Sequence, residues 1–333
     1  MSKVVTGRSC QLVRTLDGTA IVTPELGPSE LVMMAAVARR HYLRGQSKVE
    51  IASALGISRF KVARLLDLAR ESGLVRIEIA PVGRIDADLA GRLQERYGLA
   101  HCAVVVTDGT PETRAEVGAV AGRLLGEIVM DDDVLGLPWA RSIADMLATM
   151  TRLPPVPIVQ LSGALVIPGE TSSPVDLVSR AARLAGGESH LFYAPMLLDD
   201  AHSARALRRQ PTVADALRQV HRVTKAVVGI GAWTEGSSTI YRVIGDADRR
   251  AVAAAGVIGE AAGVCFDRGG NPVPTILDDR LVTVRADQLR AIPEVIGIAS
   301  GATKAPAVRA SILAGLVNSV VVDTEIAIVM ADG

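Results

Sequence analysis

The chain has 333 residues, of which 36 are Lys or Arg and 36 are Asp or Glu, so its formal net charge is zero. This length favours two domains, and an apolar fraction of 49% excludes disorder over the body of the chain. We expect no metal site and no cofactor, because the three cysteines and five histidines show no metal-ligand spacing. We also expect a cytoplasmic protein without a membrane partner, because no apolar run could span a bilayer or serve as a secretory signal.

The pattern of the chain changes near residue 29. Residues 1–28 show no clear hydrophobic period, and we expect them to form a mobile tail. From Ser29 the apolar residues recur at spacings of three and four, which predicts a helix that ends at Gly45. Two shorter helices follow. The first begins with the capping box Ser47-Lys-Val-Glu50 and ends at Gly56, and the second begins after Ser58 and ends near Ser72.

These two short helices predict a helix-turn-helix over residues 48–70. Ala52 allows a close helix approach, Gly56 suits the turn, and Val62 and Leu65 would face inward. Residues 39–76 carry nine basic and three acidic side chains, a local charge of +6. The second helix would then offer basic side chains to base edges and phosphates of double-stranded DNA. The predicted DNA-binding residues are Ser47, Lys48, Ser58, Arg59, Phe60, Lys61 and Arg64.

An ordinary helical hairpin with a solvated charged face is the alternative to this interpretation. The stretch 74–79 alternates apolar and charged residues, which predicts a strand that we interpret as part of a wing. The predicted DNA-binding domain, a winged helix-turn-helix, therefore covers residues 29–82.

Residues 83–333 form the second predicted domain, which begins with a connecting helix at 84–98. Beyond residue 100, short apolar strands alternate with helices, which predicts an α/β fold with a mostly parallel, Rossmann-like sheet. In such sheets, ligands bind beyond the carboxyl ends of the strands and beside helix N-termini. The expected strands are 102–107, 134–137, 156–161, 226–230, 295–299 and 318–322, and the expected helices are 112–129, 139–150, 174–185, 203–220, 246–255, 304–314 and 324–331.

Several motifs resemble those of the SorC family of bacterial sugar-responsive regulators. The helix-turn-helix stretch from Ser47 to Arg59, with Val62-Ala-Arg-Leu-Leu66 after it, carries the most specific likeness. The likeness covers about residues 31–331, and its further motifs are Gln160-Leu-Ser-Gly163, Val228-Gly-Ile-Gly231, Gly256-Val-Ile-Gly-Glu260 with Phe266-Asp267, Ala299-Ser-Gly-Ala-Thr-Lys304 and Val322-Asp323.

The resemblance implies a large domain similar to glucosamine-6-phosphate deaminases and ribose-5-phosphate isomerases. That domain binds a phosphorylated sugar, usually without turnover, and the family's proteins are commonly homo-oligomers, either tetramers or dimers of dimers. They regulate operons for carbohydrate uptake and catabolism, and the bound effector alters DNA binding.

The resemblance also implies an effector site made of loops in the large domain. Ser142 matches the hydroxyl that contacts the phosphate. Lys304 would supply a cation at a helix start after Ser300-Gly301, where the phosphate would also meet backbone amides. Arg141 stands where some relatives carry a Schiff-base lysine, so no covalent adduct is expected. Gly163 would allow a close backbone approach, and Glu260 or Asp267 would accept hydrogen bonds from sugar hydroxyls. The expected effector residues are Arg141, Ser142, Gly163, Gly231, Glu260, Asp267, Gly301 and Lys304.

Several residues near the predicted site also have a purely structural interpretation. Lys304 could be a solvated lysine, Glu260 and Asp267 could cap a helix or pair with Arg268, and Trp139 and Trp233 could belong to the core or stack on a sugar. Two other functions stay open at this point. The chain could be a sugar-phosphate isomerase or deaminase with an attached DNA-binding module, although no Asp–His–Glu cluster is apparent. It could also be a DNA-binding structural protein without a ligand.

Overall fold

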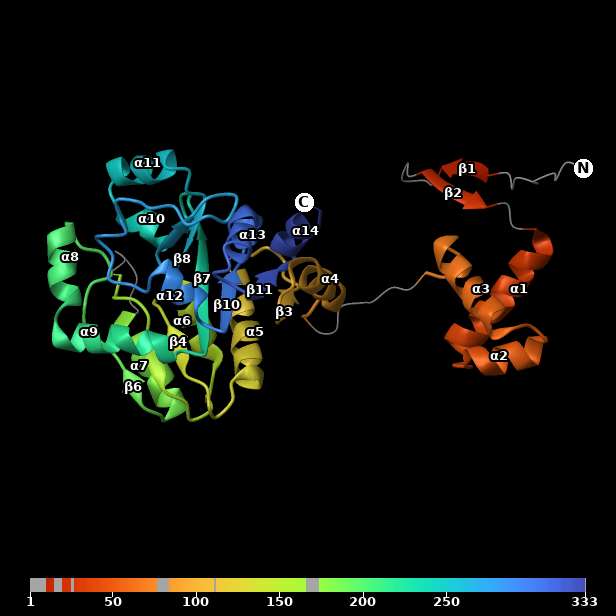
Figure 1. Ribbon diagram of the computed structural model, residues 1–333, viewed down its shortest axis with the longest axis horizontal. Helices are drawn as coiled ribbons and strands as arrows, with labels where there is room; N and C mark the ends of the chain where they lie inside the picture. The colour runs from red at the N-terminus through yellow and green to blue at the C-terminus, as the bar shows by residue number, and fades with distance from the viewer. Residues whose placement is uncertain are drawn as a thin grey trace, which may run out of the picture. The chain divides into compact units, whose positions relative to one another are not determined.

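The computed structural model describes residues 10–14, 20–24, 27–76, 84–110, 112–165 and 174–332. The chain divides into two compact units, Met1–Ile79 and Ala80–Gly333, which Figure 1 draws with labelled elements. In the first unit, β1 (Cys10–Arg14) pairs with β2 (Ala20–Pro24) in antiparallel register. The sequence predicted no regular element there, because two five-residue strands offer too few positions for a period. The mobility of the tail stays a prediction.

Three helices and a π-helical turn complete the described part of the first unit. They are α1 (Pro28–Ala38), η1 (Arg39–Leu43), α2 (Lys48–Leu55) and α3 (Arg59–Glu71). The predicted capping box is confirmed, since Glu50 N donates to Ser47 Oγ at 3.2 Å and Ser47 N donates to Glu50 Oε2 at 2.7 Å. Gly56 has the left-handed conformation, with φ +64°, that the turn requires.

The helices of the first unit enclose a small apolar core. α1 contributes Met34 and Val37, α2 contributes Ile51, and α3 contributes the predicted inward residues Val62 and Leu65, all at most 2% exposed. The predicted strand at 74–79 is not seen in its described part, where residues 74–76 form a bend and coil. The rest of that stretch, and with it the wing, lies outside the described residues.

The second unit is built on one mostly parallel sheet, which confirms the predicted α/β fold. Its strand order is β3-β11-β10-β7-β4-β5-β6, and every pair along this path is parallel. A short hairpin, β8 (Gly259–Ala261) and β9 (Val264–Phe266), adds to β7 in antiparallel fashion. The parallel strands are β3 (Cys102–Val105), β4 (Leu135–Leu137), β5 (Ile158–Gln160), β6 (Ser189–His190), β7 (Lys225–Ala232), β10 (Glu294–Ala299) and β11 (Ser319–Asp323).

Most predicted helices of the second unit are present at nearly their predicted bounds. The predicted helix 203–220 is instead two helices, because Pro211 starts a new one. The helices are α4 (Ala87–Tyr97), α5 (Thr113–Ile128), α6 (Arg141–Thr149), α7 (Pro174–Ala185), α8 (Ala201–Arg208), α9 (Pro211–Arg218), α10 (Thr239–Val243), α11 (Asp246–Ala254), α12 (Ala286–Arg290), α13 (Ala305–Leu313) and α14 (Thr324–Asp332), with 3₁₀ turns η2 (Gln219–Arg222) and η3 (Ala302–Lys304).

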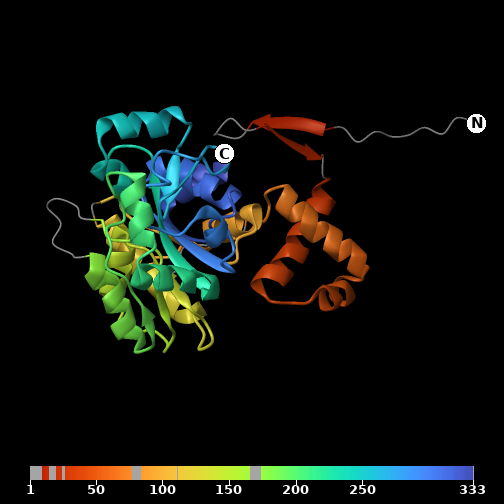
Figure 2. The same ribbon diagram turned by 60° about the vertical axis from the view of Figure 1, so that its left-hand side comes forward.

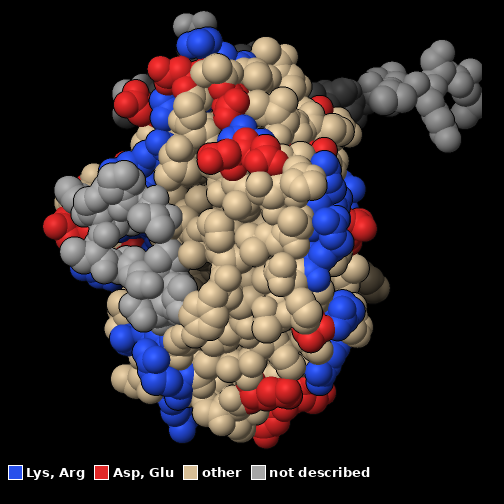
Figure 3. All heavy atoms as spheres, turned by 90° about the vertical axis from the view of Figure 1, so that its left-hand side faces the viewer, with Lys and Arg blue, Asp and Glu red and all other residues tan. Residues whose placement is uncertain are grey.

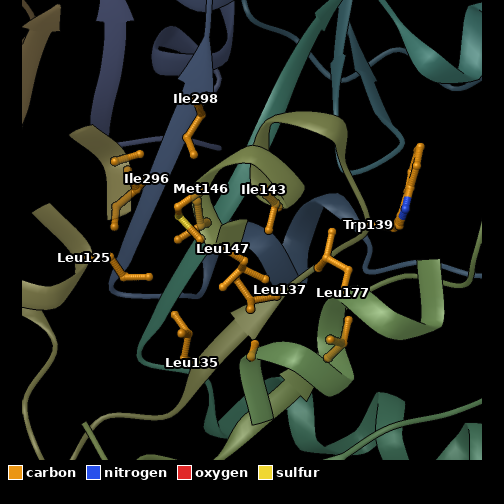
Figure 4. Packing of buried hydrophobic residues seen from close by; sticks show 14 of the residues in the cluster. Leu125, Leu135, Leu137, Trp139, Ile143, Met146, Leu147, Leu177, Ile296 and Ile298 are labelled. Atoms are coloured by element: carbon orange, nitrogen blue, oxygen red, sulfur yellow. The ribbon is translucent and has the colours of Figure 1, made fainter. Parts of the chain in front are cut away.

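The sheet is covered on both faces, as expected for parallel strands. Alternate residues of the strands belong to two separate apolar clusters: Val227 and Val321 to one, and Val228 and Val322 to the other. Figure 2 shows helices on either side of the strands. Figure 4 shows the first cluster, where side chains of α6 pack against Leu135 and Leu137 of β4 and Ile296 and Ile298 of β10.

Charge is mixed on the face of the second unit that Figure 3 presents, where Lys and Arg lie mainly along the borders and acidic groups cluster separately. This mixture contrasts with the excess of basic residues at 39–76. Among the helices that the structure describes, none is both long and apolar enough to cross a membrane. The described residues also contain no cluster of three or more His, Cys, Asp or Glu side chains that could hold a metal ion.

Candidate functional site

Two adjoining cavities open at the carboxyl ends of β4, β7 and β10, where parallel sheets bind ligands. The inner cavity measures about 60 Å³ and is lined by residues that follow these strands, with apolar walls from Trp139, Met196 and Ile298. The outer cavity measures about 240 Å³. Both cavities share five lining residues, namely Arg114, Arg141, Ser237, Ser300 and Lys304, so together they form one continuous site.

The N-terminus of α6 opens into the inner cavity. The helix begins at Arg141, after Ala140 in extended conformation, and no side chain caps it. Ala140, Arg141 and Ser142 all line the cavity, so the first turn brings backbone amides, a hydroxyl and a guanidinium to one place. Backbone amides at a helix start, with the positive end of the helix dipole, favour a phosphate or carboxylate.

Lys304 and Glu260 contribute opposite charges to the inner cavity. Burial, followed by the nearby charge of Arg141, lowers the pKa of Lys304 from 10.5 to about 8, although Glu260 acts to raise it. Burial also raises the pKa of Glu260. Its carboxylate accepts hydrogen bonds from Ser238 Oγ at 3.0 Å and from Gly263 N at 3.1 Å. Lys304 N donates to the Gly301 carbonyl oxygen at 3.0 Å, but the Lys304 side chain makes no hydrogen bond or salt bridge with another described residue. Its ammonium group is therefore available to an anion in the cavity.

The backbone amides of the loop before Lys304 do not face an open anion site. The sequence predicted that the amides around Gly301 would meet a phosphate. Instead, Gly301 N donates to Asp323 Oδ2 at 2.6 Å, and Ala302 N donates to Glu325 Oε2 at 3.3 Å. Gly301 still lines the outer cavity, but its amide is already used by a carboxylate. An anion would therefore meet Lys304 and the start of α6, rather than these amides.

The helix-turn-helix presents the predicted DNA-binding side chains to solvent. Lys48 on α2, and Arg59, Phe60 and Lys61 on the first turn of α3, are all exposed. Arg64 is also exposed, and its guanidinium lies 3.7 Å from the carboxylate of Glu30 on α1. The hydroxyls of Ser47 and Ser58 cap α2 and α3, where they accept from Glu50 N and Lys61 N, each at 3.2 Å.

Known proteins match both the large domain and the whole chain. Residues 84–330 match the family profile described as "Putative sugar-binding domain". The chain is 28% identical over 296 residues to "Uncharacterized transcriptional regulator YjhU" of Escherichia coli K12, covering 85% of this chain and 89% of that protein. It is 27% identical over 305 residues to the transcriptional regulator LsrR of Klebsiella pneumoniae, covering 90% and 92%. The full-length sorbitol operon regulator SorC of Klebsiella pneumoniae has a similar fold, with a TM-score of 0.69, 22% identity, and coverage of 91% of this chain and 99% of that chain.

The chain belongs to the SorC family of sugar-binding transcriptional regulators. Five of the effector residues expected for a SorC-family protein lie together around the inner cavity: Arg141, Ser142, Gly231, Glu260 and Lys304. A sixth expected residue, Gly301, lines only the outer cavity.

Gly163 and Asp267 line neither the inner nor the outer cavity of this SorC-family chain. At Gly163 the backbone passes so close to Pro195 that a Cβ would lie 2.6 Å from the Pro195 carbonyl oxygen. The absence of a side chain there serves packing. Asp267 is a half-buried residue directly after β9, and its carboxylate accepts from Asn271 N at 2.9 Å.

The sequence also missed residues that line the site. Arg114 on α5 lines both cavities, and its Nε donates to Asp145 Oδ2 at 2.5 Å. Thr113, at 7% exposure, lines the outer cavity, and its hydroxyl has no hydrogen-bond partner among the described residues. The Ser238 hydroxyl donates a hydrogen bond to Glu260 Oε1 at 3.0 Å. No sequence motif marks these residues, because they come from two elements far apart in the chain, the start of α5 and the N-cap of α10. Of the two tryptophans, Trp139 lines the cavity, whereas Trp233 packs in the core and donates to the Arg249 carbonyl at 3.3 Å.

Gly231 has no room for a side chain. It faces Glu260 across the β7–β8 pair, and a Cβ would lie 2.5 Å from Glu260 Oε1 and 2.9 Å from Ser238 Cβ. We expect Gly231→Ala to destabilise the protein by about 1–3 kcal/mol, the usual cost of overpacking, and to displace Glu260. Thermal unfolding measures this loss. Gly126→Ala is the matched control, because Gly126 lies in α5 with nothing within 4 Å of its added Cβ. The control is expected to gain about 0.5–1 kcal/mol, and equal effects of the two variants would contradict this assignment.

Proposed function

We propose that this chain is a DNA-binding transcription regulator of a carbohydrate catabolic operon, controlled by a phosphorylated sugar. The observation that supports the effector most strongly is the convergence on one cavity of an uncapped helix start, Ser142, Lys304 and the buried Glu260. The helix start, the hydroxyl and the cation suit a phosphate, and the carboxylate suits a sugar hydroxyl. The apolar walls, which include Trp139, suit the carbon face of a sugar ring.

The DNA-binding half of the proposal is supported by the exposed basic turn of α3. In a helix-turn-helix, the N-terminal residues of the second helix reach base edges in the major groove. In this proposal Arg59 contacts a base and Lys61 contacts a phosphate. The N-terminus of α2, with its backbone amides, lies near the DNA backbone. Such regulators read paired half-sites about one helical turn apart, or a multiple of it. We therefore also propose a homo-oligomer, a tetramer or a dimer of dimers, which light scattering of the full chain tests.

The central experiment combines thermal unfolding with gel shifts. The protein is mixed with hexose and pentose phosphates and, as controls, with the same sugars lacking phosphate. The DNA is a duplex that covers the region flanking the chain's own gene. We expect one phosphorylated sugar to raise the melting temperature and to change the DNA affinity, and the unphosphorylated sugar to do neither. Equal responses to both forms would contradict the phosphate assignment.

In this proposal the sugar phosphate is bound but not converted. The relatives described above are named as transcription regulators, and the likeness extends over most of each protein. Incubation of the protein with the responding sugar phosphate, followed by chromatography of the products, tests this point. The appearance of an isomerised or deaminated product would favour the enzyme alternative.

The affinity for the sugar phosphate is expected to depend on pH through Lys304. A cation with a pKa of about 8 is mostly charged at pH 7 and mostly neutral at pH 9.5. The phosphate stays dianionic over this range, because its second pKa is near 6. We therefore expect the affinity to fall as the pH rises through about 8, by up to tenfold per pH unit above it. Calorimetric titrations between pH 7 and pH 9.5 measure this trend, and the variant Lys304→Met should lack it.

A further inference from the structure

Phe60 is an apolar side chain in an unusual position. Of the large apolar residues that the structure describes, it is the most exposed, at 87%. The chain has only three phenylalanines, and the other two, Phe192 and Phe266, are at most 2% exposed. Phe60 is the second residue of α3 and lies on the side away from the core that Val62 and Leu65 build. The fold of the first unit therefore does not account for an aromatic side chain at this position.

The neighbours of Phe60 indicate what kind of partner would cover it. Arg59 and Lys61 flank it in the chain, and Arg64 lies one helical turn further along the same face. An apolar protein surface that buried the ring would also remove water from these cations, which is unfavourable without matching acids. A polyanion would neutralise the cations instead. Charge complementarity therefore favours nucleic acid as the partner that contacts Phe60.

Double-stranded DNA offers few apolar groups to such a ring. The base edges in the major groove present hydrogen-bond donors and acceptors, and the one apolar group among them is the 5-methyl of thymine. The N-terminal turn of the second helix of a helix-turn-helix lies at these edges.

We infer that Phe60 recognises a thymine by packing against its 5-methyl group, at a base pair next to the one that Arg59 contacts. This inference rests on the proposed function, because it requires α3 to enter the major groove. Phe60 would then determine specificity rather than overall affinity. The ring carries no charge, so its loss should leave the salt dependence of binding unchanged, whereas Lys61→Ala should reduce the slope by about 1.

The first experiment is selection of binding sites from random DNA duplexes with the full chain, as wild type and as Phe60→Ala. We expect the wild type to enrich thymine at one position in each half-site. Phe60→Ala should lose the preference at that position alone and keep the preferences at the others. Leu43→Ala is the matched control. Leu43 is a 78% exposed apolar residue on η1, the π-helical turn that precedes α2, and so lies outside α2 and α3. It should select the same sites as the wild type.

The second experiment replaces that thymine by uracil, which removes only the methyl group. We expect the wild-type affinity to fall about fourfold per half-site, the change for one buried methyl, and Phe60→Ala to bind both duplexes equally. This comparison is a thermodynamic cycle between the ring and the methyl group. If Phe60→Ala folds poorly, the wild-type comparison of the thymine and uracil duplexes still tests whether the methyl group is recognised.

The outcomes separate the inference from the proposed function. If the enriched sites contain no thymine whose replacement by uracil lowers the affinity, the role of Phe60 is overturned and DNA binding stays intact. The same holds if the uracil effect persists in Phe60→Ala, or if that variant changes only the oligomeric state, which light scattering measures. Failure to enrich any sequence would overturn both.

Discussion

Replacing Lys304 by methionine is expected to abolish the response to the sugar phosphate at working concentrations. The loss of one charge-assisted hydrogen bond costs about 1.5–3 kcal/mol, which corresponds to binding weaker by about 10- to 150-fold. The Lys304 side chain makes no hydrogen bond or salt bridge with another described residue, so the substitution breaks no such contact of the fold. Calorimetry with the responding sugar phosphate and gel shifts with and without it measure the loss.

The same substitution should stabilise the ligand-free protein. The pKa of Lys304 in the folded protein, about 8, lies below its ordinary value of 10.5. The folded state therefore disfavours the charged lysine, and this penalty is complete below pH 8 and disappears as the pH rises from 8 to 10.5. At pH 7, Lys304→Met should raise the melting temperature while it removes effector binding.

Arg309→Met is the matched control for Lys304→Met. Arg309 is an exposed cation on α13, the helix that follows Lys304 directly, and it lines neither cavity. It should respond to the sugar phosphate as the wild type does. An unchanged effector response in Lys304→Met would refute the assignment of Lys304, whatever its melting temperature.

Replacing Arg59 by alanine is expected to relax the sequence preference of DNA binding. A side chain that donates two hydrogen bonds to a guanine contributes about 1–3 kcal/mol of discrimination against other bases, which is about 5- to 150-fold. Arg59 is exposed on the first turn of α3, so the loss should appear in DNA binding and not in folding. Binding to the selected site and to duplexes with single base changes measures it.

Arg70→Ala provides the comparison for Arg59→Ala. Arg70 is an exposed arginine in the last turn of the same helix, where it pairs with Asp67 at 2.5 Å. It lies about three turns from Arg59, outside the part of the helix that enters the groove. Sequence preference should stay as in the wild type. If both variants lost affinity equally for all duplexes, Arg59 would be a phosphate contact and not a base contact.

The helix-turn-helix could be predicted from the sequence because its determinants are local. Ser47 and Glu50 cap each other across three residues, and Gly56 ends α2 in a conformation that other residues rarely adopt. Val62 and Leu65 lie one turn apart and face the same core. The parallel sheet was also predictable, since strands buried on both faces give continuous apolar runs.

The effector cavity depended on contacts between distant parts of the chain. The sequence predicted Glu260, with Asp267 as a further acid, to accept from sugar hydroxyls. Only the antiparallel pairing of β8 with β7 places Glu260 opposite Gly231, whereas Asp267 follows β9 outside both cavities. The amide of Gly301 was bound by Asp323, 22 residues away, where the sequence predicted a phosphate. Arg114 joined the site from α5, a helix whose sequence carries no sign of ligand binding.

The sequence by itself determined most of the helices and parallel strands, because capping, periodicity and turn chemistry act within three or four residues. Its motifs also identified the family. Only the tertiary structure decided which charged groups share the cavity and which backbone amides remain for an anion. Those contacts arise where the carboxyl ends of β4, β7 and β10 meet, and burial there, not sequence, lowers the pKa of Lys304 and raises that of Glu260.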